Sequence, residues 1–123
     1  MVRGLGQLET AVMQRLWDWD RPVAVREVLE DLQRDRALAY TTVMTVMDNL
    51  HTKGVVARHK SGRAYLYAPT SSREQHTAEL LDEVLTQSAG DRSAALLHFV
   101  GQLSAEEVSE LRAALSDETE DQP

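Results

Sequence analysis

The sequence contains no cysteine among its 123 residues. This absence excludes disulfide bonds, thiol catalysis, and zinc or copper sites built on cysteine ligands. No apolar run approaches the roughly 20 residues of a membrane-spanning helix, and the N-terminus lacks the apolar core of a signal peptide. We therefore expect a cytoplasmic protein that does not insert into a membrane.

Patterns of catalytic and metal-binding residues are also absent. No GxSxG, Walker or dinucleotide-binding loop occurs, so the sequence predicts neither an enzyme nor a cofactor. A small enzyme would require a site assembled across a dimer, and no residue pattern indicates one. The histidines lack metal-ligand spacing and predict structural or solvent-facing roles rather than a metal site; they are His51, His59, His76 and His98.

Charged residues are unevenly distributed along the chain. The net charge is −7. Residues 1–75 hold eleven Lys and Arg against nine Asp and Glu, whereas residues 76–123 hold two against eleven. Cations must gather where a protein meets phosphate, so only the N-terminal part is suited to contact nucleic acid. The acidic C-terminal part should serve another purpose.

The segment Tyr40–Gly54 (YTTVMTVMDNLHTKG) predicts a helix with one buried and one exposed face. Its apolar residues follow the helical spacing i, i+3, i+4 and i+7; they are Val43, Val46, Met47 and Leu50. The opposite face carries short polar side chains, namely Thr41, Thr42, Thr45, Asp48 and Asn49. Such a helix fits a DNA major groove. Lys53 and Gly54 suit its C-terminus, and Ala39, at the N-cap, offers no side-chain acceptor.

The segment Val55–Pro69 predicts a hairpin of two short strands with a turn at Ser61 and Gly62. From Lys53 to Arg73 the sequence has five cations and no acid. An exposed helix followed by a basic hairpin is typical of a winged helix, whose hairpin lies along the phosphate backbone. The predicted DNA-binding residues are Tyr40, Thr41, Thr42, Thr45, Asn49, Lys53, Arg58, Lys60 and Arg63.

Two further helices precede this pair. The first covers residues 5–19, with Gly6 as its N-cap and Glu9 three positions later. Val23–Val25 is a candidate third strand, and Arg26 opens the second helix, which ends at the polar segment 34–36. Trp17 is expected in the core or at a domain seam.

Three short helices are predicted after Pro69. Ser71 with Glu74, and Ser104 with Glu107, have the spacing of capping boxes, and Asp91 caps the middle helix. Helices this short can hardly bury their apolar faces alone, so we predict a dimerisation element. Its interface residues are Leu80, Leu81, Val84, Leu96, Phe99, Leu103, Val108 and Leu111. The predicted domains are a winged helix over 1–70 and a helical dimerisation domain over 71–123, with a frayed acidic tail from Asp117.

Six segments carry a resemblance to a known family. They are LETAVMQRLW, VREVLEDL, YTTVMTVMDNLHTKG, GRAYLYAP, ALLHFV and LSAEEVSELRAAL. In this order, from about Leu5 to Leu115, the chain resembles the penicillinase-repressor family of BlaI, MecI and CopY. The resemblance implies a dimeric winged-helix repressor that binds palindromic operators with TACA- and TGTA-like half-sites. The regulated genes would serve β-lactam resistance or cell-envelope stress.

The resemblance also implies an inducing mechanism. Members that respond to β-lactams are cut within an Asn-Phe pair after a membrane sensor protease detects the drug. The aligned pair here is His98-Phe99, which makes this bond the candidate cleavage site. Copper-responsive members end in a cysteine-rich motif, which this chain lacks. The alternative interpretation is a helical protein-interaction module that binds no DNA and carries its basic hairpin in solvent.

Overall fold

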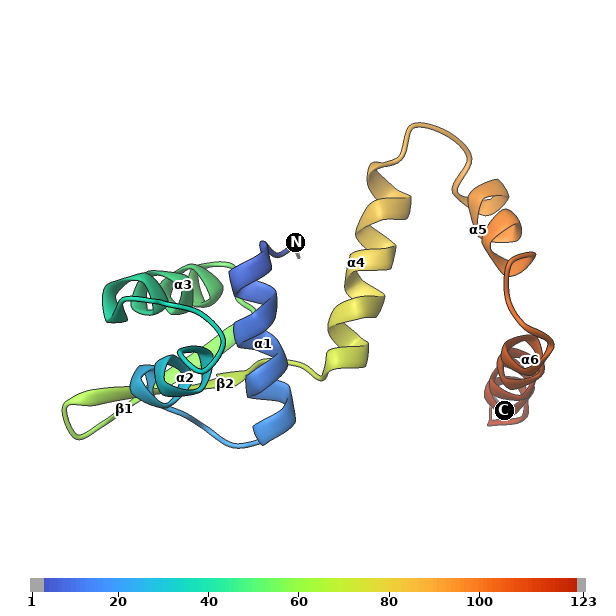
Figure 1. Cartoon of the computed structure of the whole chain (residues 1–123). Coiled ribbons are helices and arrows are strands. Elements are labelled where there is room, and N and C mark those ends of the chain that lie inside the picture. The colour runs from blue at the N-terminus through green and yellow to red at the C-terminus, as the bar shows by residue number, and fades with distance from the viewer. Residues whose placement is uncertain (1–3, 122–123) are drawn as a thin grey trace. The chain divides into compact units, whose positions relative to one another are not determined.

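The structure is a computed structural model that describes residues 4–121 (Figure 1). It is mainly helical with one two-stranded antiparallel sheet, which confirms the predicted fold class. The elements are α1 (Gln7–Trp19), α2 (Val25–Leu32), α3 (Tyr40–Thr52), β1 (Val56–Ser61), β2 (Ala64–Pro69), α4 (Arg73–Gln87), α5 (Arg92–Val100) and α6 (Ala105–Asp121). The chain divides into two compact units, and the boundary between them falls between Val84 and Leu85, within α4.

The core of the N-terminal unit lies between α1, α2, α3 and the hairpin. Val43, Met47 and Leu50 of α3 are fully buried there, as the helical spacing predicts, and Val46 is partly buried against the same cluster. The fully buried residues of α1 and α2 are Val12, Met13, Leu16, Val28 and Leu32. Burial of each such side chain contributes about 1.5 to 3 kcal/mol. This shared core fixes which face of α3 is turned outward.

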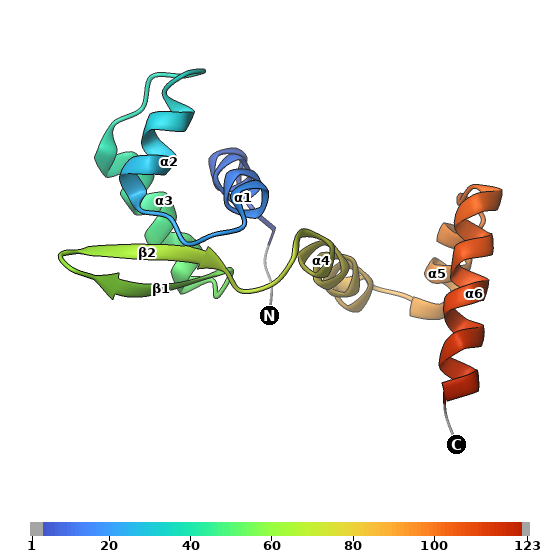
Figure 2. The same ribbon diagram turned by 90° about the horizontal axis from the view of Figure 1, so that it is seen from below.

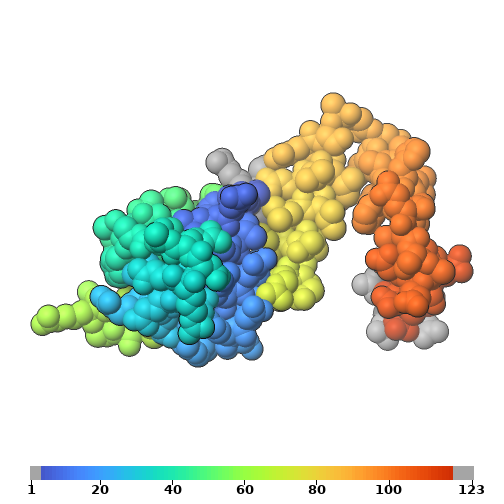
Figure 3. All heavy atoms as spheres, viewed as in Figure 1, coloured from blue at the N-terminus to red at the C-terminus, as the bar shows by residue number. Residues whose placement is uncertain are grey.

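The hairpin extends away from the helices as a narrow finger (Figures 2 and 3). Ser61 pairs with Ala64, so the turn consists of Gly62 and Arg63. The predicted turn at Ser61 and Gly62 is therefore wrong by one residue. Gly62 has a φ of 64°, a left-handed conformation that glycine adopts without strain, and this sets the position of the turn.

The third strand predicted over Val23–Val25 reduces to a single bridge. Val23 exchanges two backbone hydrogen bonds with Tyr67, of 2.9 and 2.7 Å. Val25 already belongs to α2, which begins one residue before the predicted start at Arg26. The bridge ties β2 to the segment between α1 and α2, so the hairpin is anchored to the helical core.

The predicted helix ends are mostly confirmed. The backbone N–H of Gly6 donates to the Glu9 carboxylate over 3.0 Å at the start of α1. Gly54 takes the left-handed conformation after α3, with a φ of 79°. The capping box of α4 is Ser72 with Gln75, one residue later than predicted, and its two hydrogen bonds measure 2.9 and 3.1 Å.

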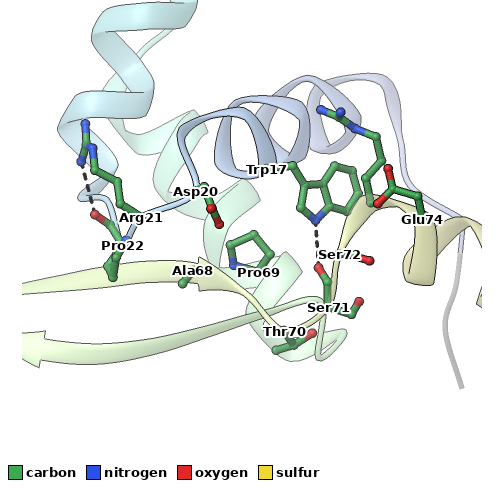
Figure 4. Close-up of a pocket in the computed structure, with 11 residues that line it drawn as sticks. Trp17, Asp20, Arg21, Pro22, Ala68, Pro69, Thr70, Ser71, Ser72 and Glu74 are labelled. Carbon is green, nitrogen blue, oxygen red and sulfur yellow. Dashed lines mark hydrogen bonds between the residues drawn. The ribbon is translucent and has the colours of Figure 1, made fainter.

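The first turns of α4 pack on the end of α1. Trp17 Nε1 donates to the carbonyl oxygen of Ser71 over 3.0 Å, and both residues line a surface hollow of about 590 Å³ (Figure 4). His76 is buried with its ring centroid 5.4 Å from that of Trp17, and Arg73 pairs with Asp18 at 2.8 Å. Trp17 thus holds the link to α4. The predicted domain boundary at residue 70 stays a prediction, and the first compact unit of the structure ends at Val84.

The C-terminal unit consists of the end of α4, α5 and α6. Asp91 accepts hydrogen bonds from the N–H groups of Ser93 and Ala94, and Ser104 and Glu107 form the predicted capping box. No side chain of residues 85–117 is buried. Helix α6 continues to Asp121, so the acidic segment expected to be frayed is helical as far as it is described. The last two residues, 122–123, lie outside the described residues.

Candidate nucleic-acid interface

Helix α3 presents a polar face to solvent along its whole length. Its exposed residues are Tyr40, Thr41, Thr42, Met44, Thr45, Asp48, Asn49, His51 and Thr52. Thr45 is exposed, and its Oγ1 donates to the carbonyl oxygen of Thr41 over 2.9 Å, so the hydroxyl can still accept a hydrogen bond. Thr45 can therefore meet a thymine methyl group or a base donor, the two partners that a threonine takes in a major groove.

A groove of about 650 Å³ lies between α3 and the hairpin. Arg26 and Tyr40 line it near the start of α3, and Tyr65 and Arg63 line it on the hairpin. The Arg26 guanidinium lies 5.8 Å from the Tyr40 ring centroid, a cation–π arrangement that places the cation beside the exposed helix face. The groove thus connects the polar face of α3 with the basic hairpin.

Lys53 is directed toward α1 rather than toward the groove. Its ammonium group lies 2.8 Å from Glu9, and the Glu9 side chain is only 13% exposed. Burial raises the pKa of Glu9, but hydrogen bonds from Lys53 and from the Gly6 N–H lower it below its usual value overall. The positive charge of Lys53 is therefore already compensated within the N-terminal unit, by a partly buried carboxylate.

Arg58 is also engaged by neighbouring side chains. Its Nη1 donates to Asp48 on α3 over 2.8 Å and to the Tyr67 hydroxyl over 3.3 Å. Its guanidinium carbon lies 4.5 Å from the Tyr65 ring centroid. Hydrogen bonding to Tyr67 and to Asp48 raises the pKa of Arg58. Arg58 thus joins the hairpin to α3.

Lys60 and Arg63 are the remaining predicted cations of the hairpin. Both side chains are exposed, and neither forms an ion pair within the described residues 4–121. Arg63 lies in the turn and Lys60 pairs with Tyr65 in the strand register. Their charges are available at the end of the hairpin, where a phosphate backbone could approach.

Met44, Arg26 and Tyr65 are among the groove residues that sequence reasoning missed. Met44 lies three residues after Thr41 and four before Asp48, so helical spacing alone could have placed it on the exposed face; it is 40% exposed. Arg26 and Tyr65 line the groove from α2 and β2. No sequence signal places these two beside α3, because each lies on a different element and only packing brings them together.

Other kinds of site find little support in the described part of the chain. Residues 4–121 contain no group of three or more His, Asp or Glu that could hold a metal ion. Within the same range no helix combines the length and the apolar character needed to cross a membrane.

Three packed helices, of which the third has an exposed face, and an adjoining two-stranded hairpin define a winged-helix DNA-binding fold. The family model of the penicillinase repressor matches residues 5–117. The chain belongs to the penicillinase repressor family. It is a transcriptional regulator of the BlaI type, as the predicted resemblance implied.

Individual relatives agree with this assignment. The transcriptional regulator BlaI of Mycobacterium tuberculosis is 45% identical over 115 residues, which cover 92% of this chain and 83% of the relative. A solution structure of the DNA-binding domain of the repressor BlaI matches with a TM-score of 0.51 and 25% identity, covering 59% of this chain and 90% of that one.

A second solved structure shares the fold. It is the monomeric form of Bacillus licheniformis BlaI in complex with the blaP half-operator. The match has a TM-score of 0.51 and 24% identity, and it covers 60% of this chain and 89% of that one.

Proposed function

We propose that the chain is a homodimeric repressor that binds palindromic operators with TACA- and TGTA-like half-sites. The observation that carries this proposal is the exposed polar face of α3 beside a groove and a hairpin with two uncompensated cations, Lys60 and Arg63. In a winged helix the third helix enters the major groove while the hairpin follows the phosphates. The helix would then recognise the base sequence, and the cations of the hairpin would add affinity that does not depend on sequence.

The proposed DNA contacts fall into two groups, polar side chains on α3 and cations on the hairpin. Tyr40, Thr41, Thr42, Thr45 and Asn49 are exposed on α3 and would meet base edges and nearby phosphates. Lys60 and Arg63 would bind phosphate from the hairpin. Lys53 and Arg58, which the sequence also suggested, would have to loosen their ion pairs with Glu9 and Asp48 to do the same.

The dimer is proposed from the apolar side chains that the single chain leaves uncovered. Leu81, Val84, Leu96, Phe99 and Leu111 are between 39% and 66% exposed. The partly buried Leu80 and Val108 lie on the same helices, and the partly buried Leu103 lies in the turn between α5 and α6. No residue from 85 to 117 is buried in the single chain. Exposed apolar side chains in such number mark an interface, and a second copy offers the matching surface.

We further propose the family's switch for this chain. A membrane sensor protease would be the partner that leads to a cut between His98 and Phe99 in α5, releasing genes of β-lactam resistance or cell-envelope stress. A protein that binds chromosomal operators acts in the cytoplasm. The support for the site is the resemblance of the ALLHFV segment and its place among the proposed interface residues.

Binding to two labelled duplexes tests the proposed function. One carries TACA- and TGTA-like half-sites in a palindrome, and the other has the same composition in scrambled order. A repressor should prefer the palindrome by at least about a thousandfold and lose affinity for both as salt rises. A helical interaction module would bind neither duplex, even at low salt.

The variant Thr45→Ala should bind the palindromic duplex about 5- to 150-fold more weakly, the loss expected for one good base contact of about 1 to 3 kcal/mol. Thr45 is exposed, so the melting temperature should remain near that of the unchanged chain. Thr45→Val retains a methyl group and separates apolar contact from hydroxyl contact. Unchanged affinity in both variants would remove Thr45 from the interface.

The variant Arg63→Ala should flatten the salt dependence of DNA binding. Each neutralised phosphate contributes about −0.9 to the slope of log affinity against log salt, so this slope should fall by about that amount per protomer. Arg112→Ala removes the same charge from α6 and serves as a control. If both variants keep the slope of the unchanged chain, the hairpin does not hold phosphate through Arg63.

A further inference from the structure

The Asp48 carboxylate occupies one side of the Arg58 guanidinium. Asp48 belongs to the exposed face of α3, and Arg58 belongs to β1 of the hairpin. Their charged atoms are 2.8 Å apart, and both residues line the groove between α3 and the hairpin. An acid on a face that meets DNA would repel phosphate, so its presence there requires a physical explanation.

Carboxylate and phosphate oxygens bind a guanidinium through the same charge-assisted hydrogen bonds. A DNA phosphate that enters the groove must therefore compete with Asp48 for Arg58. Tyr67 and Tyr65 hold the guanidinium beside Asp48 by a 3.3 Å hydrogen bond and by ring stacking at 4.5 Å. Tyr67 is itself only 2% exposed and bonded through its backbone to Val23, so Arg58 is kept within reach of Asp48.

We propose that Asp48 is an internal competitor with DNA phosphate for Arg58 and thereby limits the affinity of this protein for DNA of any sequence. The inference rests on the proposed DNA-binding function and adds a residue that regulates it. Asp48 acts through Arg58 and is a positioning residue rather than a base contact. Weak sequence-independent binding leaves more of a repressor free to find its operator.

The test measures binding of the full chain to the palindromic and scrambled duplexes over a series of salt concentrations. Asp48→Asn should free Arg58 for phosphate, because the neutral amide binds a guanidinium less strongly than a carboxylate. Binding to both duplexes should tighten about eightfold per protomer near 0.1 M salt, as follows from a salt slope steeper by about 0.9.

Two further variants make this result specific to Arg58. In Asp48→Asn combined with Arg58→Ala, the gain and the steeper slope should both disappear. Asp18→Asn removes another exposed carboxylate, which is paired with Arg73 at the same distance of 2.8 Å but does not line the groove. This control should bind both duplexes as the unchanged chain does.

Four outcomes would overturn the inference. Unchanged or weaker binding of Asp48→Asn to the scrambled duplex would show that Asp48 does not hold Arg58 from phosphate. A loss confined to the palindrome would instead assign Asp48 to a cytosine amino group. If Asp48→Asn still tightens DNA binding when Arg58 is replaced by alanine, Asp48 acts only by repelling phosphate and not by competing for Arg58. If the unchanged chain binds neither duplex, the proposed DNA-binding function fails together with the inference. If the unchanged chain binds DNA but the variants do not behave as expected, only the inference about Asp48 fails.

Discussion

A chain that ends after Gln87 should be a monomer and should bind a palindromic operator about 100- to 10,000-fold more weakly than the full chain. The truncation removes α5 and α6 but retains α4, whose first turns pack on Trp17. In a dimer, the second half-site is bound at a high effective concentration set by the first. This advantage disappears when the two DNA-binding units are no longer coupled.

The truncated chain should still fold, because its buried apolar core lies entirely between Ala11 and Tyr67. Its melting transition and its affinity for a single half-site should therefore match those of one unit of the full chain. A chain that ends after Ser116 is the matched control, since it loses acidic residues but no proposed interface residue. Sedimentation and binding to one-site and two-site duplexes measure the effect.

Two results would contradict a dimer interface on α5 and α6. If the full chain sediments as a monomer at micromolar concentration and still binds the palindrome tightly, the apolar side chains of α5 and α6 do not form a dimer interface. The same conclusion follows if the chain ending after Gln87 retains dimers. The proposed contacts of α3 and the hairpin would survive either outcome, because they lie in the N-terminal unit.

Exposure of the source cells to a β-lactam should yield a fragment that ends at His98. A cut there divides α5 and separates Phe99 and α6 from the rest of the chain. Phe99 is 46% exposed in the single chain, so its ring should be covered by the second copy and contribute to holding the dimer. The cut chain should lose operator affinity by about 100- to 10,000-fold, as the truncated chain does.

Mass spectrometry of the repressor during induction measures this event. His98→Asn restores the Asn-Phe pair of the β-lactam-responsive members and should be cut at least as rapidly, while its effect on the fold should be small because His98 is exposed. An intact chain throughout induction of the target genes would mean that this repressor leaves its operator by another route.

Local sequence signals determined most of the elements. The spacing of Val43, Met47 and Leu50 set the buried face of α3, and these residues are fully buried. The capping residues Asp91 and Ser104 act within three residues along the chain, so their partners follow directly from sequence. The resemblance of the six segments was confirmed by the family match over residues 5–117.

Two of the errors in the sequence analysis were displacements by one residue. The hairpin turn moved to Gly62 and Arg63 because strand pairing sets Ser61 opposite Ala64. The α4 capping box moved to Ser72, while the carbonyl of Ser71 accepts the hydrogen bond of Trp17. In both cases a contact with another element decided between two neighbouring positions that looked equally suitable in the sequence.

Only the tertiary structure decided what each cation near α3 does. By sequence, Lys53, Arg58, Lys60 and Arg63 form one uniform basic run. The fold pairs Lys53 with Glu9, 44 positions away, and Arg58 with Asp48, while Lys60 and Arg63 keep no ion pair within residues 4–121. Sequence periodicity specifies the face on which a residue lies, but an ion pair depends on how two elements pack, and that is determined by the shared core.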